Sequence, residues 1–242
     1  MGMAKTTSAQ NDRERGGPED RLLLIDKPVD WTSFDVVHRL RTILHVRKVG
    51  HAGTLDPKAT GLMLVCTGKW TKRIDEFVSF EKEYEGTLEL GIRTDTFDSE
   101  GRILEQKDPG TVTEEQIRSE AQRMIGMQEQ VPPMFSAVKY RGKPLYKYAR
   151  RGKTVPRTAR VIEVVAFEIS RVAMPFVDFR MVCSKGTYVR SLIDALGREL
   201  GCGATLRSLR RTRIGPYHIA QALTMEQVGD LNKRSPEPRQ GA

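Results

Sequence analysis

The sequence predicts an α+β fold, because strand-like and helix-like segments follow one another without the strict alternation that builds a parallel α/β sheet. Residues 82–91 alternate apolar and polar side chains, which is typical of a strand with one buried face. Residues 188–200 instead repeat apolar side chains at the three- and four-residue spacing of an amphipathic helix. With 242 residues the chain is long enough to bury a substantial core.

The first part of the chain predicts two short strands, a capped helix and a loop. Residues 22–25 and 62–66 are apolar runs of the length expected for buried strands. Thr32 and Asp35 have the spacing of a capping box, and apolar side chains at helical spacing follow them. Residues 50–57 are rich in glycine and end in proline, so we expect a loop there.

Beyond this loop, further elements are expected in a mixed order. In the alternating segment of residues 82–91, Tyr84 lies on the face predicted to point inward. The helix of residues 188–200 ends at Gly201, a residue type common at helix C-termini. The remaining expected elements are a helical turn, a capped helix and two strands, at residues 71–77, 113–125, 161–169 and 176–184.

The chain is expected to form one folded domain between two tails. Residues 1–20 and 233–242 lack hydrophobic periodicity and are rich in polar and charged side chains, so we predict that both are disordered. The folded domain is therefore placed at residues 21–232, and no internal repeat is visible within it.

Charge and composition narrow the class of protein. Lys and Arg total 40 against 31 Asp and Glu, and the resulting net charge of +9 favours a polyanionic partner. No apolar run approaches the ~18 residues of a membrane span, and the N-terminus lacks the apolar core of a secretory signal. The three cysteines are far apart and fit neither a disulfide scaffold nor a zinc motif. We therefore expect a cytoplasmic protein that does not bind membranes.

Common cofactor motifs give no support to several enzyme classes. The sequence contains no GxxxxGK[ST], no GxGxxG and no HExxH, and its four histidines do not cluster with Asp or Cys. Nucleotide hydrolases, dinucleotide-dependent oxidoreductases and zinc hydrolases thus lose their usual sequence evidence.

One segment, residues 131–160, departs from the average composition. It contains no acidic residue, and tyrosines, a phenylalanine and prolines interrupt its basic side chains. Phosphates would relieve the mutual repulsion of these charges, and aromatic rings between them could stack on unpaired bases. A solvated loop with a basic bias is the alternative, but the coincidence of charge and aromatic rings favours RNA contact. The basic residues are Lys139, Arg141, Lys143, Lys147, Arg150, Arg151, Lys153, Arg157 and Arg160, and a second cluster follows at Arg207, Arg210, Arg211 and Arg213.

The loop GHAGTLDPKATG (residues 50–61) holds a single carboxylate, Asp56, between Leu55 and Pro57. The proline pushes Asp56 out of helical geometry. A carboxylate on a shaped loop is a candidate nucleophile or base, although an isolated Asp-Pro pair is more often only a turn.

Three separated blocks of sequence resemble the TruB family of tRNA pseudouridine synthases. They are DKPVDWTS (residues 26–33), GHAGTLDPKATGLMLVCTGKWTK (50–72) and SKGTYVRSLIDALGRELGCGATLRSLRR (184–211), and they occur in the family's order. KEYEGTLELG (82–91) and VPPMFSA (131–137) also resemble the family. Many bacterial members continue into a small RNA-binding PUA domain, and the length of this chain leads us to expect none here.

The resemblance implies the pseudouridine synthase fold, with a central, mixed but mostly antiparallel sheet flanked by helices. It also implies an active-site cleft, and a mobile basic insertion at residues 131–160. The implied reaction isomerises uridine to pseudouridine at position 55 in the T-loop of tRNA, after the target base is flipped out. No cofactor or metal is implied, and we expect a monomer that needs no protein partner.

The resemblance also assigns roles to residues. Asp56 matches the catalytic aspartate, acting either by covalent attack or by removing a sugar proton to give a glycal. Arg190 would lie beside it, although the Arg190–Asp194 spacing also suits an ordinary helix ion pair worth ~0.2–0.5 kcal/mol. Tyr84 would stack on the uracil and help move the C5 proton after reattachment, and core packing is its alternative role.

Further residues are expected to contact the substrate RNA. His51 matches the family histidine that takes or contacts the space left by the flipped base. The other expected contacts are Lys27, Tyr188, Leu209, Lys139, Arg141, Lys143, Arg150, Arg151, Lys153, Arg210 and Arg211. Two other functions stay open at this point: a non-catalytic RNA-binding or RNA-folding protein, and a related synthase that acts on another RNA or with a guide RNA.

Overall fold

The computed structural model describes residues 19–233, and their contacts divide them into two compact units. The first unit contains residues 19–80 and 211–233, and the second contains residues 81–210. The predicted tails lie outside the described residues except at their inner ends. There Thr67 Oγ1 donates to the carbonyl of Glu19 (2.6 Å), and the Lys69 amide donates to Asp20 Oδ1 (2.7 Å). The contacts of the folded part therefore begin two residues before the predicted boundary.

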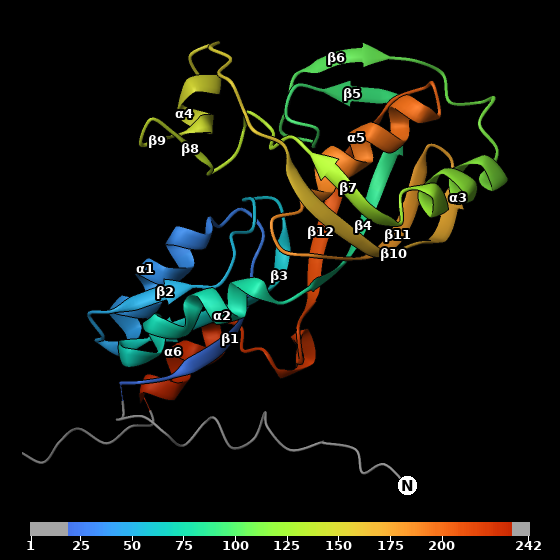
Figure 1. Ribbon diagram of the computed structural model, residues 1–242. Coiled ribbons are helices and arrows are strands. Elements are labelled where there is room, and N and C mark those ends of the chain that lie inside the picture. The colour runs from blue at the N-terminus through green and yellow to red at the C-terminus, as the bar shows by residue number, and fades with distance from the viewer. Residues whose placement is uncertain (1–18, 234–242) are drawn as a thin grey trace, which may run out of the picture. The chain divides into compact units, whose positions relative to one another are not determined.

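The first unit is a small antiparallel sheet with helices, in which β3 pairs with both β1 and β2 (Figure 1). A long strand, β12 (Ala204–Ile214), enters this unit at Arg211 and pairs with β13. The unit's other elements are β1 (Leu22–Lys27), α1 (Ser33–Leu44), β2 (Val49–His51), β3 (Thr60–Thr67), η2 (Gly68–Arg73), α2 (Ile74–Ser79), β13 (Tyr217–His218), η3 (Ile219–Gln221) and α6 (Met225–Lys233).

Helix α1 begins as the sequence predicts. The Thr32 amide donates to Asp35 Oδ2 (2.8 Å) and the Asp35 amide donates to Thr32 Oγ1 (3.1 Å), which confirms the capping box. The apolar side chains at helical spacing are buried on one face of the helix. The opposite face stays exposed, so α1 lies at the surface of its unit.

The second unit contains a four-stranded antiparallel sheet in the order β4-β11-β10-β7. Helix α3 packs on β10 and touches α5, while β5 and β6 form a separate hairpin (Figure 1). The elements are β4 (Lys82–Leu90), β5 (Ile92–Thr94), β6 (Ile103–Gln106), α3 (Glu114–Arg123), β7 (Gly126–Gln130), β8 (Lys139–Tyr140), β9 (Lys143–Pro144), α4 (Leu145–Ala149), β10 (Arg160–Ala173), β11 (Phe176–Cys183) and α5 (Val189–Glu199).

Strand β4 confirms the predicted alternation. Tyr84, Leu88 and Leu90 are buried, whereas Glu85 between them is exposed. Tyr84 faces Met181 of β11 across the antiparallel pair. The antiparallel strands, helices and lack of strict alternation confirm the α+β class.

Several elements differ from the prediction. The first two residues of the loop expected at 50–57 belong to the short strand β2, because its backbone pairs with the end of β3. The arginine-rich residues 207–213 belong to β12, where an arginine cluster hid the strand pattern. The basic segment of residues 131–160 contains its own hairpin, β8–β9, and the short helix α4.

Candidate active site

The backbone around Asp56 is held on its N-terminal side by Ser33, the first residue of helix α1. The Leu55 amide donates to Ser33 Oγ (2.9 Å), and the same hydroxyl donates to the Leu55 carbonyl (3.1 Å). Ser33 is buried, so water does not compete strongly for these bonds. On the other side, the Ala59 amide closes a turn on the Asp56 carbonyl (3.1 Å). The backbone on both sides of Asp56 is thus held by hydrogen bonds.

Lys27 holds the loop on the C-terminal side of Asp56. Its Nζ donates to the carbonyls of Pro28 (2.9 Å), Trp31 (2.5 Å) and Pro57 (3.0 Å), and its side chain is fully buried. Burial lowers the pKa of Lys27 to about 8, while the nearby Asp56 carboxylate acts in the opposite direction. The sequence assigned Lys27 to RNA contact. In this structure its three ammonium donors are used inside the protein, and RNA contact by Lys27 stays a prediction.

Arg211 ties the two ends of the same loop together. Its Nε donates to the Leu62 carbonyl (2.7 Å) and its Nη2 to the Gly53 carbonyl (3.2 Å). Gly61 has a φ of 102°, and a Cβ there would lie 2.4 Å from the Arg211 carbonyl oxygen, so only glycine fits. The side chain of Arg211 is 1% exposed. Its buried hydrogen bonds give Arg211 a structural role, and the predicted RNA contact of Arg211 stays a prediction.

His51 lies at the end of β2, half-buried, just before the loop. Burial and the positive charge of Arg211 lower the pKa of His51 below its usual value. The imidazole is therefore neutral near pH 7, and its Nδ1 is buried without a hydrogen-bond partner among residues 19–233. Such an atom is suited to meeting a substrate group.

Arg190 lies in the second unit, in the first turn of α5, and is 3% exposed. Its Nη1 donates to the Thr96 carbonyl (2.8 Å), its Nη2 donates to the Phe135 carbonyl, and its Nε lies 3.9 Å from Asp98 Oδ2. The sequence spacing offered Asp194 as an alternative ion-pair partner of Arg190. Asp194 forms ion pairs with Arg93 (3.1 Å) and Arg198 (3.1 Å). Arg190 is thus fixed by backbone carbonyls from two separate segments.

The other predicted residues of the second unit have different environments. Gln130 holds the backbone of Tyr188, because its Oε1 accepts from the Tyr188 amide (2.8 Å) and its Nε2 donates to the Tyr188 carbonyl (3.1 Å). The Arg190 guanidinium lies 5.7 Å from the centre of the half-buried Tyr188 ring. Leu209 and Arg210 are half-buried in β12.

The structure therefore brings the predicted residues together in two groups. Lys27, His51, Asp56 and Arg211 surround one loop of the first unit. Tyr84, Tyr188, Arg190, Leu209 and Arg210 belong to the second unit, as does the whole basic segment.

The basic segment presents its charges outward from an ordered base. Tyr140 and Tyr148 meet edge to face with ring centres 5.9 Å apart, and the Tyr148 hydroxyl donates to the Tyr140 carbonyl (3.2 Å). Leu145 is 1% exposed, which anchors α4. All of the segment's predicted RNA contacts are exposed: Lys139, Arg141, Lys143, Arg150, Arg151 and Lys153.

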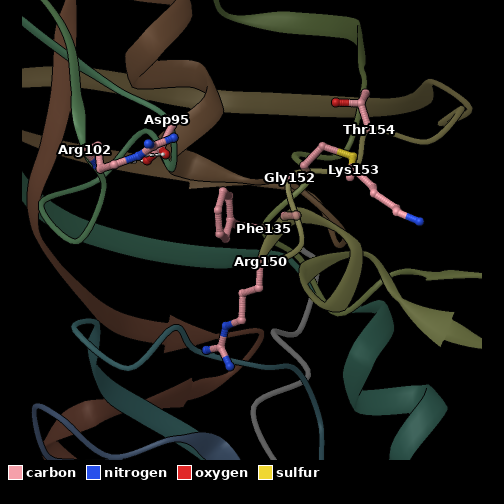
Figure 2. A pocket seen from close by; sticks show the side chains of 9 residues that line it. Asp95, Arg102, Phe135, Arg150, Gly152, Lys153 and Thr154 are labelled. Atoms are coloured by element: carbon pink, nitrogen blue, oxygen red, sulfur yellow. Dashed lines mark hydrogen bonds and ion pairs between the residues drawn. The ribbon is translucent and has the colours of Figure 1, made fainter.

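A pocket of about 570 Å³ lies between this segment and the β5–β6 hairpin of the same unit (Figure 2). Figure 2 shows the Phe135 ring centrally among the labelled side chains, with Arg150 and Lys153 extending away from it in different directions. Asp95 and Arg102 form an ion pair (3.2 Å) on the hairpin side. The pocket is lined by Asp95, Arg102, Met134, Phe135, Ala149, Arg150, Gly152, Lys153 and Thr154.

Three residues of these sites were missed in the sequence. Ser33 directly follows the predicted helix cap, Thr32. A serine in the first turn of a helix gives no sign that its hydroxyl binds a backbone group 22 residues away. Gln130 and Asp98 likewise act on residues distant in the chain. For Asp98 the one signal was its position inside RTDTFDSEG (residues 93–101), a stretch rich in turn-forming residues.

Among residues 19–233, no group of three or more His, Cys, Asp or Glu side chains is placed to hold a metal ion. The part of the chain that the structure describes also has no helix long and apolar enough to cross a membrane.

Sequence comparison finds the family. Residues 41–189 match the profile described as TruB family pseudouridylate synthase (N terminal domain), and residues 190–238 match the tRNA pseudouridylate synthase B C-terminal domain. The chain is 49% identical over 212 residues to tRNA pseudouridine synthase B of Opitutus terrae, covering 88% of each chain. It is 44% identical over 228 residues to the protein of that name from Chloroherpeton thalassium, covering 92% of this chain and 95% of the relative.

Solved structures show the same relationship. A chain in the crystal structure of a Cbf5-Nop10-Gar1 complex superposes with a TM-score of 0.69 at 31% identity. The match covers 86% of this chain and 53% of that one, so this chain spans about half of its length. With two matching profiles, close relatives and a shared fold, the chain belongs to the TruB family of pseudouridylate synthases.

Proposed function

We propose that this protein isomerises uridine to pseudouridine at position 55 in the T-loop of tRNA, with Asp56 as the catalytic carboxylate. The observation that carries the proposal is the anchoring of the Asp56 loop. Ser33 holds the residue before Asp56 and Lys27 holds the residue after it. Preorganisation of this kind is what a reacting group needs, and an ordinary surface turn does not require two buried clamps.

The reaction breaks the bond between N1 of the uracil and C1′ of the ribose, and makes a bond from C5 to C1′. The proton on C5 is lost and N1 gains one, so the isomerisation is redox-neutral. Asp56 either adds to the nucleotide covalently or removes a sugar proton to give a glycal. Both paths require an ionised carboxylate.

Tyr84 and Arg190 complete the proposed catalytic set from the second unit. Tyr84 stacks on the uracil, and Arg190 stabilises the charge of the carboxylate and of the reacting group. The burial of Arg190 and its three fixed partners support this role, because a held guanidinium loses little entropy when it acts.

RNA binding is assigned to the basic segment and His51. The exposed lysines and arginines of residues 139–153 bind phosphates, which places the T-arm against the protein. The neutral His51 contacts the space that the flipped uridine leaves. We propose that the protein acts in the cytoplasm as a monomer without a protein partner or cofactor.

An assay on an unmodified tRNA transcript tests this function. We expect pseudouridine to form at position 55, and the uridine-to-cytidine transcript at that position to yield none. Tight binding of the transcript without any pseudouridine would instead indicate a non-catalytic RNA-binding protein. Product from the cytidine transcript would show that another uridine is the target.

A further inference from the structure

Gln130, the last residue of β7, is a buried polar residue that the proposed reaction does not use. We propose that Gln130 is a positioning residue, whose carboxamide fixes the start of α5 and thereby the Tyr188 ring and the Arg190 guanidinium. This role rests on the proposed function, and all three residues belong to the second unit. Gln130 is only 8% exposed, so it acts through these neighbours and not by touching RNA.

The side chain of Gln130 binds both polar groups of the Tyr188 backbone. Its Oε1 accepts from the Tyr188 amide (2.8 Å) and its Nε2 donates to the Tyr188 carbonyl (3.1 Å), across 58 residues of sequence. Tyr188 is extended, with φ −99° and ψ 99°, so its N–H and C=O can meet one partner as they do in an antiparallel sheet. A carboxamide presents the acceptor and the donor that this pair requires.

Helix α5 begins at this contact. Tyr188 occupies the N-cap position, and its side chain makes no capping hydrogen bond to any described residue. The Tyr188 carbonyl accepts the first bonds of the helix, from the amides of Ser191 (3.1 Å) and Leu192 (3.3 Å). Gln130 therefore fixes the residue on which the first turn is built, and Arg190 lies in that turn.

The stretch that begins with Gln130 also holds the guanidinium of Arg190. Nη2 of Arg190 donates to the carbonyl of Phe135, further along the same stretch. Pro132 and Pro133 lie between the two contacts and are buried, and their rings fix φ, which restricts how far the contacts can move apart. Because β7 pairs with β10, the sheet is the frame from which both contacts are made.

Loss of the Gln130 contact should displace reacting groups without weakening the contacts to RNA. The Tyr188 amide would lose its acceptor, and the first turn of α5 could shift against the sheet. A shift of about 1 Å in a reacting group can lower a rate by about 100-fold. KM should change little, because the exposed lysines and arginines proposed to bind phosphates are untouched.

Replacing the carboxamide by a thioether of similar size tests the role while keeping the packing. Gln130→Met should lower kcat on a tRNA transcript by about 10- to 100-fold and change KM less than about threefold. Gln128→Met is the matched control, because Gln128 lies on the same strand and its Nε2 donates to the nearby Met124 carbonyl (2.7 Å). It should leave kcat unchanged. Equal losses of kcat in both variants, or a loss confined to KM, would overturn the proposal.

A double-mutant cycle with Arg190→Lys separates positioning from general stability. If Gln130 acts through the guanidinium, Gln130→Met should lower kcat much less in the Arg190→Lys background than in wild type. Losses that multiply in full in the double variant would contradict the proposed role.

Gln130→Glu gives a second test that does not require the methionine variant to fold. A protonated carboxyl presents the same acceptor and donor as the amide, whereas the ionised form has no donor for the Tyr188 carbonyl. Burial raises the pKa of a carboxyl, so kcat relative to wild type should fall about tenfold between about pH 5 and pH 9 as the introduced group ionises. A ratio that stays constant over this range would overturn the proposal.

Hydrogen exchange keeps this role separate from the proposed function. If wild type forms no pseudouridine, the proposed function fails, and the Ser191 and Leu192 amides still report whether Gln130 holds the start of α5. These amides should exchange about tenfold faster in Gln130→Met than in wild type or Gln128→Met. Equal exchange in all three proteins would show that Gln130 does not position the helix.

Discussion

The carboxylate of Asp56 depends on three neighbours that differ in how they act. Ser33 fixes both polar groups of the Leu55 backbone, Lys27 fixes the Pro57 carbonyl, and Arg211 fixes the Gly53 carbonyl. Each buried donor replaces water that would otherwise let the turn fluctuate. The side chain of Asp56 itself remains partly exposed, so a substrate can reach it.

Replacing Asp56 by asparagine should separate chemistry from binding. Asparagine has a similar volume but neither attacks as a nucleophile nor removes a proton, so we expect pseudouridine formation to fall at least 1,000-fold, on the order of a lost nucleophile. The Kd for tRNA should change less than about threefold, because phosphate contacts dominate affinity. Filter binding and a pseudouridine assay measure the two quantities. Loss of both would indicate a structural role for Asp56.

Ser33 and its neighbour Thr32 offer a matched pair of variants that tests whether the hydrogen bonds of Ser33 to Leu55 position Asp56. We expect Ser33→Ala to lower kcat by about 10- to 100-fold with little change in KM, since a loop shifted by about 1 Å misplaces the carboxylate. Thr32→Ala removes only the helix cap. It should lower the free energy of unfolding by about 1 kcal/mol while leaving kcat unchanged.

Steady-state kinetics and urea unfolding of both variants decide this prediction. Ser33→Thr, which retains a hydroxyl, should recover part of the lost kcat. Equal losses of kcat in Ser33→Ala and Thr32→Ala would mean that Ser33 matters only for helix stability.

The buried Lys27 predicts a dependence of stability on pH. Its pKa of about 8 in the folded protein lies below the ordinary 10.5, so between these values the unfolded chain binds the extra proton. Stability therefore rises with pH across this window and is lower below pH 8, where folding must bury the charged form. The advantage of wild type over Lys27→Met in urea unfolding should grow from pH 8 to 10.5. Lys58→Met, a change at an exposed lysine, should show no such trend.

A wild-type advantage over Lys27→Met that stays constant across the window would show that Lys27 keeps an ordinary pKa.

A residue of the site was predictable from the sequence when its bonding partners lie close to it along the chain. The capping box of Thr32 and Asp35 is confirmed because both partners lie within one helical turn. Lys27 was assigned to RNA contact from the family motif, and Arg211 from its cluster of arginines; neither signal reports that the side chain is buried. Their carbonyl partners Pro57 and Gly53 lie 30 and 158 residues away, and only the fold brings them together.

Among the elements, the basic segment combines an ordered base with exposed cations. Its tyrosine pair and Leu145 pack internally, while Arg150, Arg151 and Lys153 face solvent. The sequence predicted the charges and rings of this segment but not its hairpin and helix, because these elements are too short to show periodicity. Strand β12 was missed for a related reason, since its arginines interrupt the alternation of apolar and polar side chains that would indicate a strand.

Neutralising Arg150, Arg151 and Lys153 together to glutamine should weaken tRNA binding and flatten its salt dependence. Losing three phosphate contacts should reduce the slope of log Kd against log salt by about 2 to 3. The control changes Arg123, Arg171 and Arg198 to glutamine, which lowers the net charge equally at exposed sites outside the segment. An equal change in slope for both triple variants would mean that overall charge, and not this segment, attracts the RNA.

At the scale of the whole molecule, the α+β class followed from the order of the segments, and the family followed from blocks of motif spread along the chain. The division into two compact units was not predicted, because β12 contributes to both and no linker composition marks the boundary. The proposed catalytic residues come from both units: Asp56 from the first, and Tyr84 and Arg190 from the second.

The central claim is that this chain converts one uridine of tRNA with Asp56 as the carboxylate. The most direct measurement maps pseudouridine in an unmodified tRNA transcript after incubation with wild type or with Asp56→Asn. We predict a single pseudouridine at position 55 with wild type and none with the variant, at equal amounts of bound tRNA. Pseudouridine formed equally well by Asp56→Asn, or none formed by wild type, would contradict the account.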